Sequence, residues 1–265
     1  MNSFFEDLGL PKGFLFQVSS LFVCILVVHT LYLLFIDPAA ADQLLVAGSL
    51  NKAPDRTLAI ILHDTEQEVC LIFFFWALSI IYLKWKDINL QVQHLEEDIL
   101  DNNQERKPIT VKEANSSREK VALFLAGHPN SILPSSLWAG LNTFVISENI
   151  GDATSATYKI CDTEGERMES ELSMIRYIIW AIPSIGFIGT VRGIGEALSQ
   201  AHIAVEGDIA GMTASLGVAF NSTFVALVIS ILLMFFLHQL QLGQDRLVLD
   251  TRGYCDKNLL SNLSR

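Results

Sequence analysis

Charged residues are scarce in this sequence of 265 residues, at 18% of the chain against about 25% in soluble domains. Hydrophobic residues make up 51%, and the mean hydropathy is +0.38. Bases are the minority among the charged residues, and the formal net charge of −11 disfavours binding to a phosphate backbone. The scarcity of charge excludes a disordered chain and an ordinary soluble domain. The negative net charge predicts that nucleic acid is not a partner.

Cysteine is rare as well, with four residues in the chain. Cys24 and Cys70 lie inside apolar stretches, and Cys161 and Cys255 are isolated. This distribution excludes a disulfide scaffold of the secreted kind. We therefore expect four free thiols.

The sequence contains no Walker loop and no nucleophile elbow. His63 and Asp64 stand close to Glu66 and Glu68, but without a spacing typical of zinc sites, and we expect a solvated acidic turn there. His29, inside an apolar stretch, is expected to form a hydrogen bond with a neighbouring helix. We therefore predict a protein that is not an enzyme, with no catalytic residue, no metal site and no cofactor.

Four stretches carry no Asp, Glu, Lys or Arg at all. They are Phe14–Ile36, Val69–Leu83, Tyr177–Val191 and Ile209–Leu237. The first and the last exceed the roughly 20 residues that span a hydrocarbon core, and the middle two reach that length with flanking residues. Because proline interrupts helices, the first helix is expected to end at Asp37-Pro38. The pattern predicts an all-α, polytopic membrane protein with four transmembrane helices and long cytoplasmic helical extensions.

The spans divide the chain into four regions. We expect a two-span region over 1–83, with spans at 14–36 and 66–86 and an external loop at 37–65; a cytoplasmic helical segment over 84–173; spans three and four over 174–240; and a cytoplasmic tail over 241–265. Lys and Arg cluster after span two, before span three and in the tail, which places both termini in the cytoplasm. The N-terminus lacks a basic n-region, so the first span is expected to be retained and not cleaved as a signal peptide.

Apolar residues continue past span two at helical spacing, at Trp85, Ile88, Val92, Leu95 and Ile99. This spacing predicts that the helix of span two continues as an amphipathic helix packed on its neighbours. Beyond it we expect a turn at Asp101–Lys107, a helix over Arg118–Ala126, loops at Gly127–Asn130 and at Pro134, and a break at Gly253 in the tail.

Spans three and four each carry a face of small and hydroxyl residues. In span three this face contains Pro183, Gly186, Thr190 and Gly193, with Gly189 beside it. In span four it contains Gly211, Ser215, Ala219, Ser222, Ala226 and Ser230, with Thr223 at its border. Small faces let helix backbones approach closely in lipid, so the two faces either pack on each other or line a narrow polar path. Neither span has a carboxylate at its middle, so a titrating group would come from another chain.

Two segments of these spans carry a family pattern. The segment Ile182–Gly193, IPSIGFIGTVRG, resembles the P-x-L-G-L-L-G-T-V-x-G segment of the MotA/TolQ/ExbB proton-channel family. The segment Ala219–Leu227, AFNSTFVAL, resembles the A-L-x-T-T-x-x-G-L segment of the next span in that family. The resemblance covers Met174–Leu240 well, whereas the N-terminal half is similar only in its layout.

The resemblance implies a stator-type subunit of a proton-driven motor in the bacterial inner membrane. Five copies would surround a dimer of a single-span ExbD/TolR/MotB-like partner whose membrane Asp carries the proton, converting proton-motive force into rotation or force. Thr190 and Thr223, with Ser222 beside them, match the positions that face this Asp. Pro183 matches a hinge position, and Gly186, Gly189 and Gly193 permit the hinge or close packing.

The chain departs from the family pattern at several points. Ala226 replaces a glycine, which predicts slightly wider packing. Arg192 takes the place of an apolar residue, and pairs with Glu196, with an acid of the partner or with lipid phosphate. No long coiled-coil tail is expected after span four. The alternative function is a membrane scaffold or sensor, in which the small faces only pack and the cytoplasmic segment binds a regulator.

Overall fold

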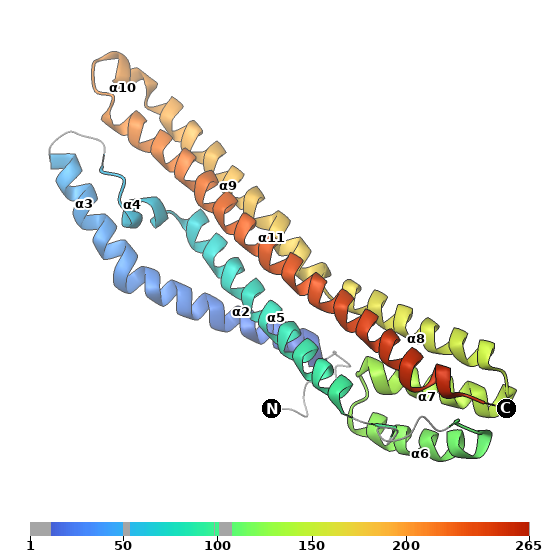
Figure 1. The fold of residues 1–265 in the computed structure, drawn as a ribbon. Coiled ribbons are helices and arrows are strands. Elements are labelled where there is room, and N and C mark those ends of the chain that lie inside the picture. Colours follow the sequence, from blue (N-terminus) through green and yellow to red (C-terminus); the bar gives the residue numbers. More distant parts are fainter. Residues whose placement is uncertain (1–11, 50–53, 98, 101–107, 265) are drawn as a thin grey trace. The chain divides into compact units, whose positions relative to one another are not determined.

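The computed structural model describes residues 12–49, 54–97, 99–100 and 108–264, and it is built almost entirely of helices (Figure 1). Within these ranges there is no strand, and β-pairing is limited to one isolated bridge between Ile109 and Leu263. Four helical segments are long and apolar enough to cross a membrane. They are Leu15–Ser49, Thr65–Glu96, Ile150–Ser199 and Ala210–Asn262. The predicted all-α membrane fold with four spans is confirmed.

The chain forms two compact units. The first comprises residues 1–81 and 174–237, and the second comprises residues 82–173 and 238–265. Helices α5 (Thr65–Glu96) and α11 (Ala210–Asn258) contribute residues to both. We describe each unit by itself.

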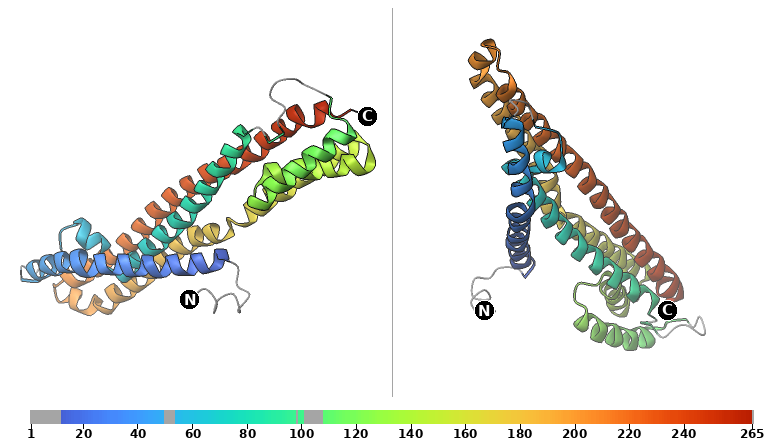
Figure 2. Two further views of the ribbon diagram at one scale, coloured as in Figure 1. Left: turned by 90° about the horizontal axis from the view of Figure 1, so that it is seen from below. Right: turned by 90° about the vertical axis from the view of Figure 1, so that its left-hand side faces the viewer.

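The first unit contains the apolar spans. Besides parts of α5 and α11 it holds α2 (Lys12–Leu31), the π-helix η1 (Tyr32–Ile36), α3 (Asp37–Ser49), α4 (Leu58–Leu62), α9 (Ser173–Ser199) and α10 (Ala201–Val205). Within this unit α9 and α11 run antiparallel and lie side by side, as the views in Figures 1 and 2 show. Trp76 of α5 donates an Nε1–H hydrogen bond to the Gln17 carbonyl at 2.9 Å, which links α5 to α2.

The expectation that Pro38 ends the first helix is wrong. The helix passes through η1 directly into α3, where Pro38 is the second residue. In η1 the Asp37 N–H bonds the Tyr32 carbonyl, one residue further back than in an α-helix, and Pro38 then falls in a first turn, where its missing N–H is tolerated. The predicted loop 37–65 therefore contains α3 and the short helix α4, and α5 begins separately at Thr65.

The second unit packs shorter helices around α7. Its elements are α6 (Val111–Gly127), α7 (Ile132–Ser147), α8 (Ile150–Ser170) and the 3-10 turn η2 (Leu260–Asn262), together with the ends of α5 and α11. Leu137, Leu141 and Phe144 of α7 are fully buried at its centre. A methyl group at Gly140 would lie 2.3 Å from the Thr157 hydroxyl, so α7 and α8 approach closely there.

The helix boundaries in the second unit differ from expectation at several places. The continuation of span two is confirmed, since α5 runs to Glu96. The helix expected over Arg118–Ala126 begins earlier, at Val111, where Thr110 and Glu113 form a capping box. Pro134 lies in the first turn of α7 and not in a loop.

The expected break at Gly253 is also wrong, because α11 continues through it to Asn258. A glycine inside a helix costs about 1 kcal/mol relative to alanine, but here Thr251 and Cys255 on either side are fully buried. This burial outweighs the local preference of glycine. The turn expected at Asp101–Lys107 lies outside the described residues.

Candidate functional site

The small faces of α9 and α11 pack directly on each other. A methyl group at Gly186 would lie 2.4 Å from the Cβ atom of Ala226 and 3.0 Å from the Ser222 carbonyl oxygen. One at Gly193 would lie 2.7 Å from the Ala219 backbone nitrogen. Side chains cannot occupy this space, since the obstructing atoms belong partly to backbone. The glycines therefore set how closely the two helices approach, and Gly186 accommodates the methyl group of Ala226.

Gly189 occupies the middle of the same contact. A methyl group added at this position would lie 2.5 Å from the Cβ atom of Ser222 and 3.2 Å from the Cγ atom of Glu66 in α5. The absence of a side chain at this position lets three helices meet. Of the two arrangements left open by the sequence, the structure shows the packed one within this chain.

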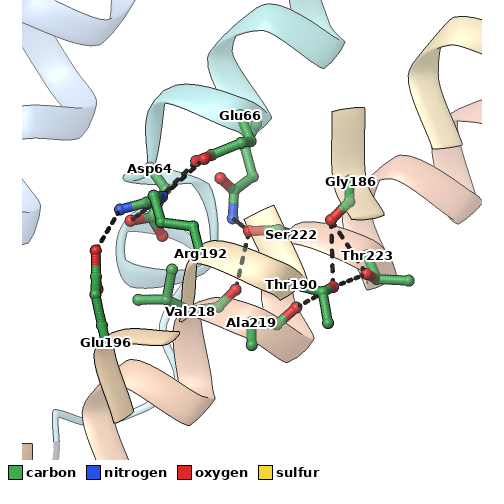
Figure 3. Close-up of polar contacts among 11 residues, drawn as sticks. Asp64, Glu66, Gly186, Thr190, Arg192, Glu196, Val218, Ala219, Ser222 and Thr223 are labelled. Atoms are coloured by element: carbon green, nitrogen blue, oxygen red, sulfur yellow. Dashed lines mark hydrogen bonds and ion pairs between the residues drawn. The ribbon is translucent and has the colours of Figure 1, made fainter. Parts of the chain in front are cut away.

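Thr190 and Thr223 meet across this interface and form a hydrogen bond between their hydroxyl groups (Figure 3). The Thr190 hydroxyl also reaches the carbonyl oxygens of Gly186 at 3.2 Å and Ala219 at 3.0 Å. The Thr223 hydroxyl reaches the same Gly186 carbonyl at 3.2 Å. Both threonines are half-buried. Helix packing therefore aligns two hydroxyls and two carbonyls in one cluster at the edge of the α9–α11 contact.

This cluster has more acceptors than protons. Each hydroxyl carries one proton and two lone pairs, whereas each can choose between the other hydroxyl and a helix carbonyl. Both carbonyls also accept a backbone N–H within their helices, so a departing hydroxyl leaves no orphaned acceptor. Either threonine can therefore turn its O–H toward a third group at little cost.

Pro183 removes one backbone hydrogen bond from α9, and α11 replaces it. Proline has no N–H, so the carbonyl of Ile179, four residues earlier, loses its helical donor. The buried Ser230 hydroxyl donates to this carbonyl at 3.1 Å. Neighbouring hydroxyls restore such freed groups in membrane helices. Ser230 therefore allows a proline inside a buried helix contact.

Ser222 lies behind the threonine pair and not on an open surface. Its side chain is 1% exposed, and its hydroxyl donates to the Val218 carbonyl at 2.9 Å. The Gln67 amide of α5 approaches the same hydroxyl at 3.4 Å. Within this chain Ser222 is therefore covered by α5, whereas Thr190 and Thr223 stay half-buried; its expected role toward a partner stays a prediction.

Gln67 was missed by the sequence analysis. It is fully buried in the first unit, and its Oε1 atom has no hydrogen-bond partner in the part of the chain that the structure describes. A polar side chain at the start of an apolar run is the signal that marks such a residue, because polar groups in a span face protein. The neighbouring acids Glu66 and Glu68 obscured that signal.

Arg192 lies at the centre of a four-residue charge cluster. Its Nε and Nη2 atoms donate to the two carboxylate oxygens of Glu66, each at 2.8 Å, and Nη2 also reaches Asp64 Oδ1 at 3.2 Å. Nη1 reaches Glu196 Oε1 at 3.3 Å. Figure 3 shows the guanidinium held between these three acids. Of the three partners considered for Arg192, Glu196 lies within reach in this chain, but the two-pronged contact with Glu66 has the shorter distances.

The acidic turn before α5 is thus not the solvated one we expected. The carboxylates of Asp64 and Glu66 are only 14% and 13% exposed, because Arg192 of α9 covers them. His29 of α2 forms the predicted hydrogen bond with a neighbouring helix, from Nδ1 to Glu68 Oε1 at 2.7 Å. The start of α5 is therefore tied to both α2 and α9.

All four cysteines are free, as predicted. Among the described residues, no group of three or more His, Cys, Asp or Glu side chains could hold a metal ion. The opposite face of α11 is apolar and exposed. Its residues are Phe220, Phe224, Leu227 and Ile231.

These features define a multi-pass helical membrane protein whose third and fourth spans form a close, hydroxyl-bearing contact. Residues 130–252 match the model of the MotA/TolQ/ExbB proton channel family, which confirms the resemblance of the two motifs to that family. The match also takes in α7 and α8, beyond the region 174–240 in which the motifs lie. No curated protein and no solved structure matches the chain. The match supports a proton-channel or ion-driven motor subunit in general terms.

Proposed function

We propose that this chain is the ring-forming stator subunit of a proton-driven motor in the bacterial inner membrane, with both termini in the cytoplasm. Five copies surround a dimer of a single-span ExbD/TolR/MotB-like partner. The partner's membrane Asp carries the proton, and its passage converts proton-motive force into rotation or force. The chain has no catalytic residue and needs no cofactor.

The hydroxyl pair of Thr190 and Thr223 is the observation that carries this proposal. A carboxylate in a dry interface needs hydrogen-bond donors when it is charged and acceptors when it is protonated. The pair offers both, because its protons can exchange among several acceptors. It also lies in the family-matched segment and is half-buried at the edge of the helix contact. A partner helix placed along that edge brings its Asp within reach.

The surrounding residues support the pair. Ser222 holds the threonine-bearing turn of α11 against α5. Gly186, Gly189 and Gly193 keep α9 close enough for the hydroxyls to meet. Pro183 weakens the backbone of α9 at its hydrogen bond to α11, which is where a hinge would bend. Arg192 and Glu196 belong to the outer charge cluster, which fixes α9 to α5.

The test is proton flux into liposomes that contain the chain together with the partner that copurifies with it. Thr190→Val and Thr223→Val keep the side-chain shape and remove the hydroxyl. Each should reduce flux at least tenfold while the complex still assembles. The matched control is Thr213→Val, also in α11, because that hydroxyl bonds only the Ile209 carbonyl of its own helix.

Normal flux in both threonine variants would overturn the proton-path assignment. Absence of a copurifying single-span protein with a membrane Asp would overturn the motor proposal itself. In that case the scaffold or sensor function becomes the better account of the packed small faces.

A further inference from the structure

The first unit has a cavity of about 370 Å³ that the proposed proton path does not use. It lies between the first turns of α11 and the segment from α3 to the start of α5. Its walls are mostly apolar, with Leu44, Ile60, Leu216 and Phe220 among them. Its polar groups include Arg56, Asp64 and Asn221. Small-molecule sites have this composition and volumes of about 300–1,000 Å³.

Asn221 is the feature that most needs a ligand. Its side chain is 8% exposed and lines the cavity, yet its amide makes no hydrogen bond with any residue described in the structure. An amide in a membrane span that finds no partner in its own chain favours a polar partner from outside it. The amide offers two donors and one acceptor to whatever fills the cavity.

The charged groups of the cavity have opposite signs. Arg56 is exposed and forms no ion pair within the described ranges. Asp64 is mostly buried, and its Oδ1 atom accepts from Arg192, whereas Oδ2 forms no hydrogen bond with the described residues. A purely anionic ligand would meet the Asp64 carboxylate, and a purely cationic one would meet the Arg56 guanidinium. A ligand with both charges satisfies the two residues together.

The position of the cavity favours a lipid. It runs along α11 from Thr213, in the first turn of a spanning helix and so near the level of the lipid headgroups, to Asn221. Phe220, which lines the cavity, is 61% exposed, and Leu45, which follows the lining residue Leu44 in α3, is 73% exposed. The volume suits a headgroup and not whole acyl chains, which would lie along these exposed side chains.

We propose that this cavity binds a phospholipid whose headgroup carries a phosphate and a primary ammonium group, as in phosphatidylethanolamine. Arg56 binds the phosphate, while the Asp64 carboxylate and the Asn221 amide oxygen accept N–H bonds from the ammonium. A quaternary ammonium cannot donate these bonds, so phosphatidylcholine should bind less well. This inference does not rest on the proposed proton transport.

The test is native mass spectrometry of the complex released from nanodiscs made with phosphatidylethanolamine, phosphatidylcholine or phosphatidylglycerol. Asn221→Leu and Arg56→Gln should each lower retention of phosphatidylethanolamine about tenfold. Phe220→Ala should lower it too. The controls are Phe224→Ala, which changes an equally exposed ring one turn away, and Arg246→Gln, another exposed arginine, on the second unit.

Equal retention in the wild-type protein and the Asn221→Leu and Arg56→Gln variants would overturn the proposal, as would stronger retention of phosphatidylglycerol. Competition by soluble glycerophosphoethanolamine as strong as by the intact lipid would show that the site takes a free headgroup and not a membrane lipid. A changed number of chains per complex in Phe220→Ala would show that a second copy of the chain covers the cavity. Thermal unfolding of each variant separates these outcomes from misfolding.

Discussion

Pro183 and Ser230 act as a pair, because the stabilising role of the Ser230 hydroxyl depends on the proline. Proline leaves the Ile179 carbonyl without its helical donor, and the Ser230 hydroxyl supplies the missing hydrogen bond. The hydroxyl thus stabilises α9 from α11. The stabilisation depends on the proline, because a residue with an N–H would bond the same carbonyl itself.

This dependence predicts a non-additive double mutant. Ser230→Ala should lower the free energy of unfolding by about 1 kcal/mol, because the buried carbonyl loses its partner. In a Pro183→Ala background the same change should cost almost nothing, because the backbone N–H at position 183 then bonds Ile179. Denaturation of the four proteins in mixed micelles measures the coupling. Equal costs in both backgrounds would show that Ser230 acts only through packing.

At the level of helices, Gly186 and Ala226 act as one fitted contact. The family pattern has a glycine where this chain has Ala226, and we expected slightly wider packing there. The methyl group instead fits against Gly186, which has no side chain. The two helices share this space, so the combined volume of the side chains at positions 186 and 226 determines how closely the helices pack. Which of the two helices carries the methyl group matters less.

The contact predicts partial rescue by exchange. Gly186→Ala alone places two methyl groups 2.4 Å apart and should destabilise the packed spans by about 1–3 kcal/mol. Gly186→Ala combined with Ala226→Gly removes that clash and should recover part of the loss. Recovery stays partial because the Ser222 carbonyl is still only 3.0 Å from the new methyl group. Thermal unfolding of both variants and of Ala226→Gly tests this, and the absence of any rescue would contradict the shared-space account.

The sequence predicted the helix faces better than the contacts between them. Spacing along one helix shows that Gly186, Thr190 and Gly193 share a face, because helical geometry alone determines this. It does not show the register of one helix against another. The approach of Gln67 to Ser222 and of Arg192 to Glu66 depends on that register. Local signals at Pro38 and Gly253 predicted breaks that a π-turn and a buried environment made unnecessary.

For the whole molecule, our proposal makes the site incomplete in a single chain. The described spans supply hydroxyls at Thr190 and Thr223, and Arg192 of the same helix α9 is already paired with Glu66 of α5. An acid for proton transfer therefore has to come from a second polypeptide in our proposal. The sequence leads to the same hypothesis, because spans three and four lack a carboxylate at their middle.

If this chain supplies the hydroxyls and a partner supplies the acid, the proposal predicts the composition of the functional complex. Native mass spectrometry should give five copies of this chain with two of the partner, and rings without the partner should not conduct protons. Conduction by this chain alone would show that it contains its own proton carrier. A complex with a different copy number would leave the hydroxyl pair in place but would contradict the proposed ring.

Helix α11 runs without interruption from Ala210 to Asn258, so Thr223 and the buried Ser230 share one helical phase. Each inserted residue turns everything downstream by about 100°. A single insertion between them would therefore rotate Ser230 out of register with Thr223, whereas seven residues, close to two full turns, would nearly restore it. Insertions and deletions within α11 should accordingly be rare in homologous sequences. Those that occur should be about seven residues long.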